Sequence, residues 1–245
     1  MTQLDQAAGE PDLRALLAAA GTAAIANVLL RRGLRNVCLV GLSPLSPEQA
    51  VMVGPAFTLR FIPAREDLDT MAAYARSDNV HRRAIEECPA GSVLVIDAQG
   101  ETRVSSAGDM MAARLVARGA AGLVTDGGFR DVAGIRQTGL PAYQRMVATA
   151  ATPIALHPVE LNAPIGCAGV AVYPGDMIVG DASGVVAIPS HMAEEVARDA
   201  YQAAQYEAFA EIQIARGRSL FGLFPATAES QAEYRAWLAA GRPKS

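Results

Sequence analysis

Apolar residues recur along this chain at two spacings, one typical of helices and one typical of strands, and the two alternate. Helical spacing, with glycine after several of the segments, predicts helices over residues 12–33, 80–87, 110–118, 132–138 and 192–216. Short apolar or alternating runs predict strands over residues 36–42, 51–62, 92–97, 120–125, 169–173, 177–180 and 185–188. This order of elements predicts an α/β fold.

Several local signals refine this pattern. The first helix is interrupted at Gly21, and Thr22 is placed to cap its second half. Residues 65–79 are charged and are predicted to lie on the surface, whereas residues 141–147 are predicted to be extended. The three strands between residues 169 and 188 are joined by Gly-Asp turns and predict a small antiparallel unit.

The chain ends in an alanine-rich helix and an aromatic tail. We interpret residues 1–190 as an α/β domain and residues 191–245 as a C-terminal helical arm of the same unit, because the sequence has no repeat and no low-complexity linker. The tail exposes more apolar surface than a lone arm should, which predicts subunit contacts near it. Its aromatic residues are Phe221, Phe224, Tyr234 and Trp237.

The candidate chemistry lies in residues 105–131. Asp109 begins a predicted helix, and the free N–H groups of a helix start favour an anion. An Asp-Gly-Gly turn at residues 126–128 follows the next strand, and Arg130 and Asp131 come directly after it. Arg130 can bind a carboxylate through two hydrogen bonds, and Asp109 and Asp131 can hold a hard divalent cation. The stretch therefore predicts a site for a small carboxylic acid beside a metal.

Each of these signals also has a purely structural explanation. Asp109 can serve only as a helix cap, the Asp-Gly-Gly segment only as a turn, and Arg130 with Asp131 only as a solvated surface pair. The two glycines favour a site, because they allow a close approach of the backbone.

The composition of the chain argues against some classes of binding partner. The 245 residues are 51% hydrophobic with a net charge of −4, so the chain can bury a sizeable core and presents no basic surface for nucleic acid. No apolar run is read as reaching transmembrane length, and the first residues are polar and acidic, which predicts no membrane partner. The three cysteines are odd in number and widely spaced, as expected of thiols in a reducing cytoplasm.

The metal expected from the sequence is one that prefers oxygen ligands. His81, His157 and His191 form no H-x-x-x-H pattern, which leaves carboxylates and therefore Mg²⁺ or Mn²⁺. The chain has no phosphate-binding loop, no dinucleotide-binding glycine motif and no complete nucleophile elbow. Among the kinds of chemistry considered, metal-assisted chemistry on a carboxylate is the one that the sequence still supports.

Two segments together resemble the signature of one known family. They are Gly108-Asp109-Met110-Met111 and the run from Arg118 to Asp131, which ends in D-G-x-x-R-D. Further matches lie at residues 54–58, 174–176 and 180–186. The family contains the metal-dependent 4-hydroxy-4-methyl-2-oxoglutarate / 4-carboxy-4-hydroxy-2-oxoadipate aldolases and also the regulator of ribonuclease activity A. The resemblance covers roughly residues 20–190.

The resemblance implies a fold, an assembly and a set of roles. The fold would be a swivelling α/β/β/α-type domain, assembled as a trimer or a dimer of trimers with the site between subunits. By match to the aldolases, Asp131 binds the Mg²⁺ or Mn²⁺, Asp109 holds a metal-bound water, and Arg130 binds the substrate and steadies the enolate. The backbone at Gly108, Met110 and Met111 holds the pyruvyl carboxylate.

The chain departs from the family pattern in two places. Asn27 stands where many members have aspartate, and residues 65–88 differ from the best-known aldolases. In the aldolases a glutamate reaches in from a neighbouring subunit, and Glu207 and Glu211 are both candidates for it.

Two functions from different classes follow from the resemblance. The first is a lyase that cleaves a 4-hydroxy-2-oxo dicarboxylic acid to pyruvate and a second carbonyl acid, with oxaloacetate decarboxylation as a side activity. The second is a non-catalytic trimeric protein that regulates a partner such as a ribonuclease. Retention of Asp109, Arg130 and Asp131 favours the enzyme.

Overall fold

The computed structural model describes residues 12–242, so the polar N-terminal residues discussed above lie outside the described part. The main sheet contains the path β1 (Ser43–Pro44), β7 (Ala142–Gln144), β5 (Gly122–Thr125), β3 (Val93–Asp97), β2 (Met52–Pro63), β12 (Met177–Asp181) and β13 (Gly184–Ile188). An eighth strand, β9 (Leu156–Leu161), pairs with β2 beside this path.

Two small sheets and the helices complete the fold. The first small sheet is parallel and contains β4 (Ser105–Ala107), β6 (Gly128–Phe129) and β8 (Met146–Val147). The second is the antiparallel pair of β10 (Ile165–Cys167) and β11 (Val170–Val172). The helices are α1 (Leu13–Arg31), α2 (Met71–Tyr74), α3 (Val80–Glu87), α4 (Asp109–Ala117), α5 (Val132–Gln137), α6 (Ala193–Ala215) and α7 (Ala228–Ala239), with 3₁₀ turns η1 (Thr152–Ile154) and η2 (Ser190–Met192).

The parallel strands β7, β5, β3 and β2 are covered on both faces. On one face, Leu94 and Leu123 pack with residues of α3, α4 and α5, such as Leu115. On the other face, Val95 and Val124 pack against residues of β10 to β13. Burial on both faces explains why β3 reads as a continuous apolar run rather than an alternating one.

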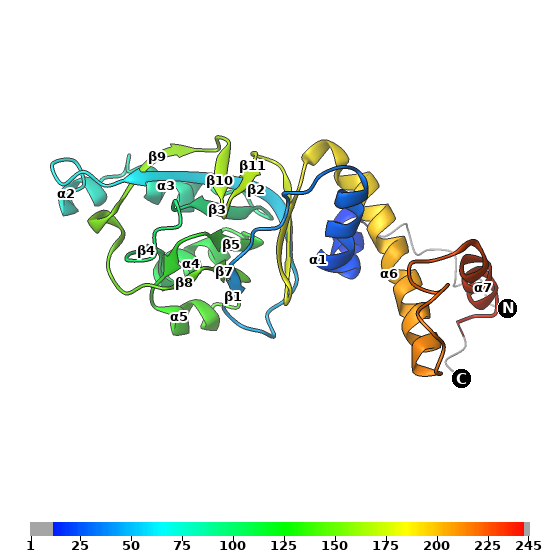
Figure 1. The fold of residues 1–245 in the computed structure, drawn as a ribbon. Helices are drawn as coiled ribbons and strands as arrows, with labels where there is room; N and C mark the ends of the chain where they lie inside the picture. The colour runs from blue at the N-terminus through cyan, green and yellow to red at the C-terminus, as the bar shows by residue number, and fades with distance from the viewer. Residues whose placement is uncertain (1–11, 243–245) are drawn as a thin grey trace, which may run out of the picture.

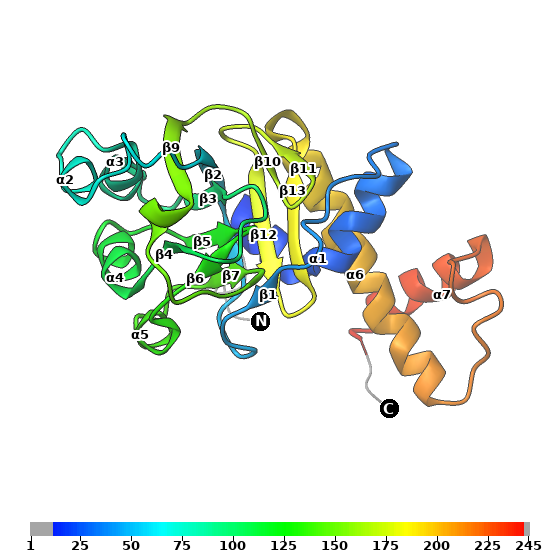
Figure 2. The ribbon, with the colours of Figure 1, turned by 60° about the vertical axis from the view of Figure 1, so that its left-hand side comes forward.

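Helices α1 and α6 lie side by side and cover the outer face of the β12–β13 hairpin. The order of layers is therefore helices, parallel strands, antiparallel strands and helices, and the predicted α/β class is confirmed (Figure 1). Helix α2 lies at one end of the molecule and α7 at the other (Figure 1, Figure 2).

The break predicted in the first helix is confirmed, but its cap is different from the one expected. Gly21 has a φ of 76°, which kinks α1. The backbone N–H and the hydroxyl of Thr22 both donate to the carboxylate of Asp181 on β12, at 2.7 Å each. The buried Thr22 side chain thus contacts the β12–β13 hairpin and not its own helix. The carboxylate of Asp181 therefore caps the second half of α1 in its place.

Helix α1 also corrects the expectation that no segment reaches transmembrane length. By length and composition alone, Leu13–Arg31 is long and apolar enough to cross a membrane. One such helix is weak evidence, however, and here Leu17, Ile25 and Leu29 are fully buried in the layer beneath α6. Packing in the core accounts for part of its apolar composition, since a third of the segment is buried.

The strand predictions were correct for the buried runs and wrong in two places. Residues 36–42 form only an isolated bridge between Cys38 and Val186, because Gly41 turns the chain with a φ of 83°. The predicted three-stranded antiparallel unit is only a hairpin of β12 and β13, since β11 pairs with β10. Strands β4, β6, β9 and β10 are not predicted by the apolar pattern.

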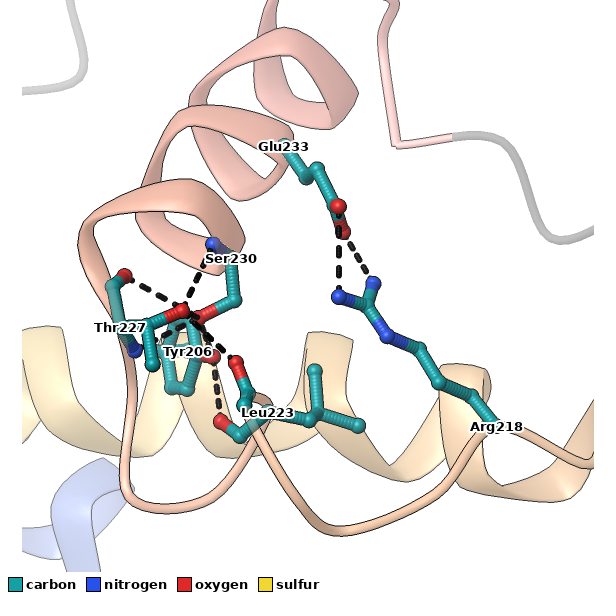
Figure 3. A network of polar contacts seen from close by, with 7 residues as sticks. Tyr206, Arg218, Leu223, Thr227, Ser230 and Glu233 are labelled. Carbon is teal, nitrogen blue, oxygen red and sulfur yellow. Dashed lines mark hydrogen bonds and ion pairs between the residues drawn. The ribbon is translucent and has the colours of Figure 1, made fainter.

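The aromatic tail is not an irregular tail, because part of it forms helix α7. Thr227 and Ser230 make a reciprocal capping box at its start. The Tyr206 hydroxyl of α6 donates to the carbonyl oxygen of Leu223 at 2.6 Å, and Arg218 pairs with Glu233 across the turn (Figure 3). These contacts fold the end of the chain back onto α6.

A buried carboxylate connects the loops at the end of the parallel strands. Asp126, between β5 and β6, accepts hydrogen bonds from the backbone N–H groups of Ala98 (2.7 Å), Gly100 (3.1 Å) and Ala168 (3.2 Å). A Cβ atom on the following Gly127 would lie 2.7 Å from that of Ala98. The Asp-Gly-Gly turn is thus a tightly packed junction and not only a change of direction.

Asp126→Asn should lower the free energy of unfolding by about 2–3 kcal/mol, because an amide has one acceptor oxygen and turns its NH₂ group toward N–H donors. Chemical denaturation measures this effect. Asp67→Asn is the control, since Asp67 pairs with Arg65 on the exposed surface and should leave the midpoint unchanged. Equal midpoints for wild type and Asp126→Asn would contradict the assigned role.

Candidate functional site

The two predicted motifs meet because two short strands are parallel neighbours. Strand β4 ends just before Gly108, β6 ends just before Arg130, and Ala107 pairs with Phe129. The backbone N–H of Arg130 donates to the carbonyl oxygen of Ala107 at 3.1 Å. Residues that follow parallel strands emerge at the same edge, so Gly108 and Arg130 are brought side by side.

Gly108 lies in close contact with the side chains of Arg130 and Asp131. A Cβ atom on it would lie 3.1 Å from Oδ2 of Asp131 and 3.2 Å from Cγ and Nε of Arg130. Nε of Arg130 lies 3.2 Å from Oδ2 of Asp131, and both side chains are about half exposed. The glycine therefore lets this ion pair lie directly against the start of α4.

Asp131 occupies a helix N-cap position without capping the helix. Its φ of 53° is left-handed, a conformation that aspartate tolerates better than most residues. Its side chain makes no capping hydrogen bond to α5. The carboxylate thus remains available to Arg130 and to a ligand.

The sequence predicted Asp109 at the start of α4, with a capping role as one explanation. In the structure Asp109 is the first helical residue of α4 and not its N-cap. The cap is Gly108, whose extended backbone continues from β4 (φ −141°, ψ −175°) and offers no side chain. One carboxylate oxygen of Asp109 accepts from the N–H of Met110 at 2.7 Å. A Cβ atom on Gly134 of α5 would lie 2.7 Å from Cβ of Asp109, so α5 holds this side chain closely.

Five of the six predicted site residues line one hollow of about 210 Å³, and Asp131 lies beside it through its pair with Arg130. Met110 is 79% exposed, whereas Met111 packs partly against the core. The five lining residues are Gly108, Asp109, Met110, Met111 and Arg130.

The residues of the opposite wall of this hollow were not predicted from the sequence. Tyr74 of α2 and Thr152 and Pro153 of η1 line it too. Residues 65–79 were expected only to form charged surface, yet α2 covers the site. Burial raises the pKa of Tyr74, and the nearby positive charges of Arg130 and Arg82 oppose that shift.

His81 of α3 lies behind Tyr74 and is fully buried. Its ring is edge-on to those of Phe61 (5.1 Å between centroids) and Tyr74 (6.0 Å). Neither ring nitrogen meets hydrogen-bond geometry with any group in the described part of the chain, although the backbone of Ser106 lies close enough to raise the pKa slightly against the effect of burial. Burial lowers the pKa of His81 from 6.5 to about 4, so the ring is neutral near pH 7.

Asp109 and Asp131 are the residues here that could hold a metal. Among residues 12–242 no group of three or more His, Cys, Asp or Glu side chains gathers in one place. Zinc cages need such a group, whereas Mg²⁺ is commonly bound through one or two protein carboxylates. The two aspartates therefore fit Mg²⁺ or Mn²⁺ and do not form a closed cage.

The two candidate glutamates lie far from this hollow within the chain. Glu207 and Glu211 are on α6, in the arm at the opposite end from α2 (Figure 1). Glu207 lines a separate hollow between the arm and α1, together with Asn27 and Tyr234. Neither glutamate can reach Arg130 of its own chain.

Comparison with known proteins gives the family. A family model described as aldolase/RraA matches residues 22–187. The chain belongs to this family. A protein of Halalkalibacterium halodurans, named as a candidate 4-hydroxy-4-methyl-2-oxoglutarate aldolase, is 36% identical over 172 residues, which cover 69% of this chain and 73% of that protein. A protein of Xanthomonas campestris with the same name is 37% identical over 49% of this chain and 72% of its own length.

A solved structure supports the same family. RraAS2 of Streptomyces coelicolor, described as an unusual member of the RNase ES inhibitor RraA protein family, superposes with a TM-score of 0.71. It is 31% identical and covers 83% of this chain and 98% of its own. The family therefore includes proteins named as aldolases and proteins named as ribonuclease inhibitors.

His81 should make the folded state sensitive to acid. Because its pKa is lowered in the folded protein, the unfolded chain binds the proton first, and stability is lost as pH falls from 6.5 toward 4. The loss from this residue should approach about 3 kcal/mol. Unfolding of wild type and His81→Phe across this range measures it as the difference between the two curves.

His191→Phe is the matched control, since His191 is exposed and should leave the wild-type pH dependence unchanged. The same slope in His81→Phe as in wild type would show that His81 does not titrate in this way.

Proposed function

We propose that this chain is a divalent-metal-dependent carbon–carbon lyase that cleaves a 4-hydroxy-2-oxo acid to pyruvate and a second carbonyl compound. The observation that carries the proposal is the hollow that gathers the start of α4, Arg130 and the uncapped carboxylate of Asp131. The acid named for the relatives, 4-hydroxy-4-methyl-2-oxoglutarate, is the first substrate to test. Oxaloacetate decarboxylation is a side activity of the same site, because it also passes through pyruvate enolate.

The carboxylate of the pyruvyl half would bind at the first turn of α4. There the N–H of Met110 donates to Asp109 in the free protein. A substrate carboxylate would replace that acceptor and accept hydrogen bonds from the backbone N–H groups of Met110 and Met111. Binding would thereby release the Asp109 carboxylate for proton transfer.

Asp131 would hold the metal, with Asp109 near it, because the Asp131 carboxylate caps no helix. A bound Mg²⁺ or Mn²⁺ supplies a Lewis acid for the 2-oxo group. Arg130, fixed against Gly108, would place its guanidinium at the same oxygen and stabilise the negative charge that develops there.

Cleavage breaks the bond between C3 and C4 of the substrate. The C4 hydroxyl loses its proton and becomes a carbonyl group, and the electron pair of the broken bond passes into the enolate of pyruvate. The enolate then takes a proton at C3 and leaves as pyruvate. We assign the proton transfer to Asp109, whose position is fixed by contact with Gly134.

A second candidate function is regulation of a ribonuclease by binding. The likeness to RraAS2, named for a family of RNase inhibitors, favours it. Pyruvate release from 2-oxo acids with added Mg²⁺ or Mn²⁺ separates the two, since a purely regulatory protein would release none.

The assembly we propose is a trimer or hexamer with the arm at or near subunit contacts. Phe221 is 94% exposed and Phe224 and Leu220 about half, at the tip of the arm. Covering these side chains would remove apolar surface from water. Size-exclusion chromatography with light scattering should give three or six subunits, and a monomer at micromolar concentration would contradict the proposal.

Removal of the metal should abolish turnover, and Asp131→Asn should prevent its binding. Asparagine tolerates the left-handed backbone of this position but lacks the negative charge. Calorimetric titration with Mn²⁺ is expected to show binding to wild type, weakened binding to Asp109→Asn and none to Asp131→Asn. Full turnover in EDTA, or equal Mn²⁺ affinity in Asp131→Asn and wild type, would contradict the assignment.

Arg130→Lys should lower kcat at least about a hundredfold, the usual cost of losing one preorganised donor to a developing oxyanion. Lysine keeps the charge but not the planar pair of donors. Steady-state pyruvate release measures the effect, beside a melting curve and a Mn²⁺ titration that should match wild type. Near-wild-type kcat in this variant would make Arg130 only a counter-ion of Asp131.

A further inference from the structure

A second hollow, of about 320 Å³, adjoins the first. The two share Tyr74, Thr152 and Pro153, so these three residues form a common wall. The second hollow lies between α2, the start of α3 and strand β9. A molecule bound through its pyruvyl half at Arg130 therefore has an adjoining space beyond Tyr74.

The charges that line this second hollow are already paired with one another. Nδ1 of His157 lies 2.6 Å from Oδ1 of Asp69, whose other oxygen accepts from the N–H of Arg65 at 2.7 Å. The guanidinium of Arg76 forms a two-bonded ion pair with Asp78. No cation that lines this hollow is thus without a carboxylate partner among the described residues.

One neutral hydrogen-bonding group in the common wall has no partner. The Tyr74 hydroxyl makes no hydrogen bond to any of residues 12–242, and Tyr74 is only partly buried. A phenol offers one donor and one acceptor. His81 also borders the hollow, but both of its ring nitrogens are buried away from solvent, so the Tyr74 hydroxyl is the group that a ligand can reach.

We infer that the second hollow binds the half of the substrate that carries no pyruvyl group, and that this half is uncharged and bears hydroxyl groups. A second carboxylate would face the carboxylates of Asp69 and Asp78, and the guanidinium that lines the hollow, that of Arg76, already pairs with Asp78, which disfavours it. A hydroxyl group both donates and accepts, and so matches the phenol of Tyr74. This inference rests on the proposed lyase function and names its substrate class as a hydroxylated 4-hydroxy-2-oxo acid with a single carboxylate.

The condensation direction offers a direct test with simple probes. Pyruvate loses a C3 proton to give the enolate, and C3 then bonds to the aldehyde carbon while the carbonyl electron pair moves to its oxygen and takes a proton. Glyceraldehyde is the neutral hydroxylated acceptor and glyoxylate the charged one. Exchange of the pyruvate C3 protons with D₂O requires only the first hollow and reports the proposed function by itself.

Ala73→Phe fills the second hollow, because Ala73 lines it and does not line the first. Ala72→Phe is the matched control, since Ala72 is exposed on the same short helix and lines neither. With Mg²⁺ present, wild type should use glyceraldehyde with a kcat/KM at least tenfold above that for glyoxylate. Ala73→Phe should lower the glyceraldehyde value at least tenfold and keep proton exchange within twofold, and Ala72→Phe should change neither.

Three results would overturn the inference while leaving the proposed function intact. They are a preference for glyoxylate in wild type, an unchanged glyceraldehyde value in Ala73→Phe, and an equal loss in Ala72→Phe. Leu68→Trp, which enlarges a different lining residue, replaces Ala73→Phe if that variant does not fold, and the same outcomes apply to it. Absence of proton exchange in wild type would instead reject the lyase function, and the inference with it.

Discussion

The site depends on a buried carboxylate that never touches it. Asp126 accepts hydrogen bonds from three backbone N–H groups, which lie in the loop after β3 and in the turn between β10 and β11. This fixes the turn from which β6 starts, and β6 in turn pairs with β4. The register of that pair decides where Gly108 and Arg130 emerge, so the geometry of the candidate site follows from hydrogen bonds made several residues upstream.

The core of the site could be predicted from sequence because its signals are local. Glycine beside aspartate at a helix start, and an Arg-Asp pair after a glycine turn, each have a recognisable pattern, and the structure places Gly108 next to Arg130. Tyr74 could not be predicted in this way. Its helix has four residues within a charged segment, and its position depends on η1, which lies about eighty residues further along the chain.

The same distinction explains the fold predictions. The buried run of β3 and the kink at Gly21 are properties of their own sequence, and both were predicted. Residues 36–42 are equally apolar, yet their partner Val186 comes from a distant strand and only one bridge forms. Helix α7 has alanine and aromatic residues on several faces, so its existence depends on the Thr227 cap and on packing against α6 rather than on a clear apolar stripe.

The arm has a small core of its own, separate from the three that surround the sheets. Its buried side chains are Tyr206, Phe209, Ala210 and Leu223, with Tyr234 and Trp237 packed against them. A cluster of this size stabilises its surroundings much less than the main core does. The first half of α6 belongs to the core shared with α1, so the lower stability applies to the part of the arm from Tyr206 onward. Amide hydrogens of that part should exchange with solvent through local opening, whereas those of β3 and β5 should exchange only on global unfolding.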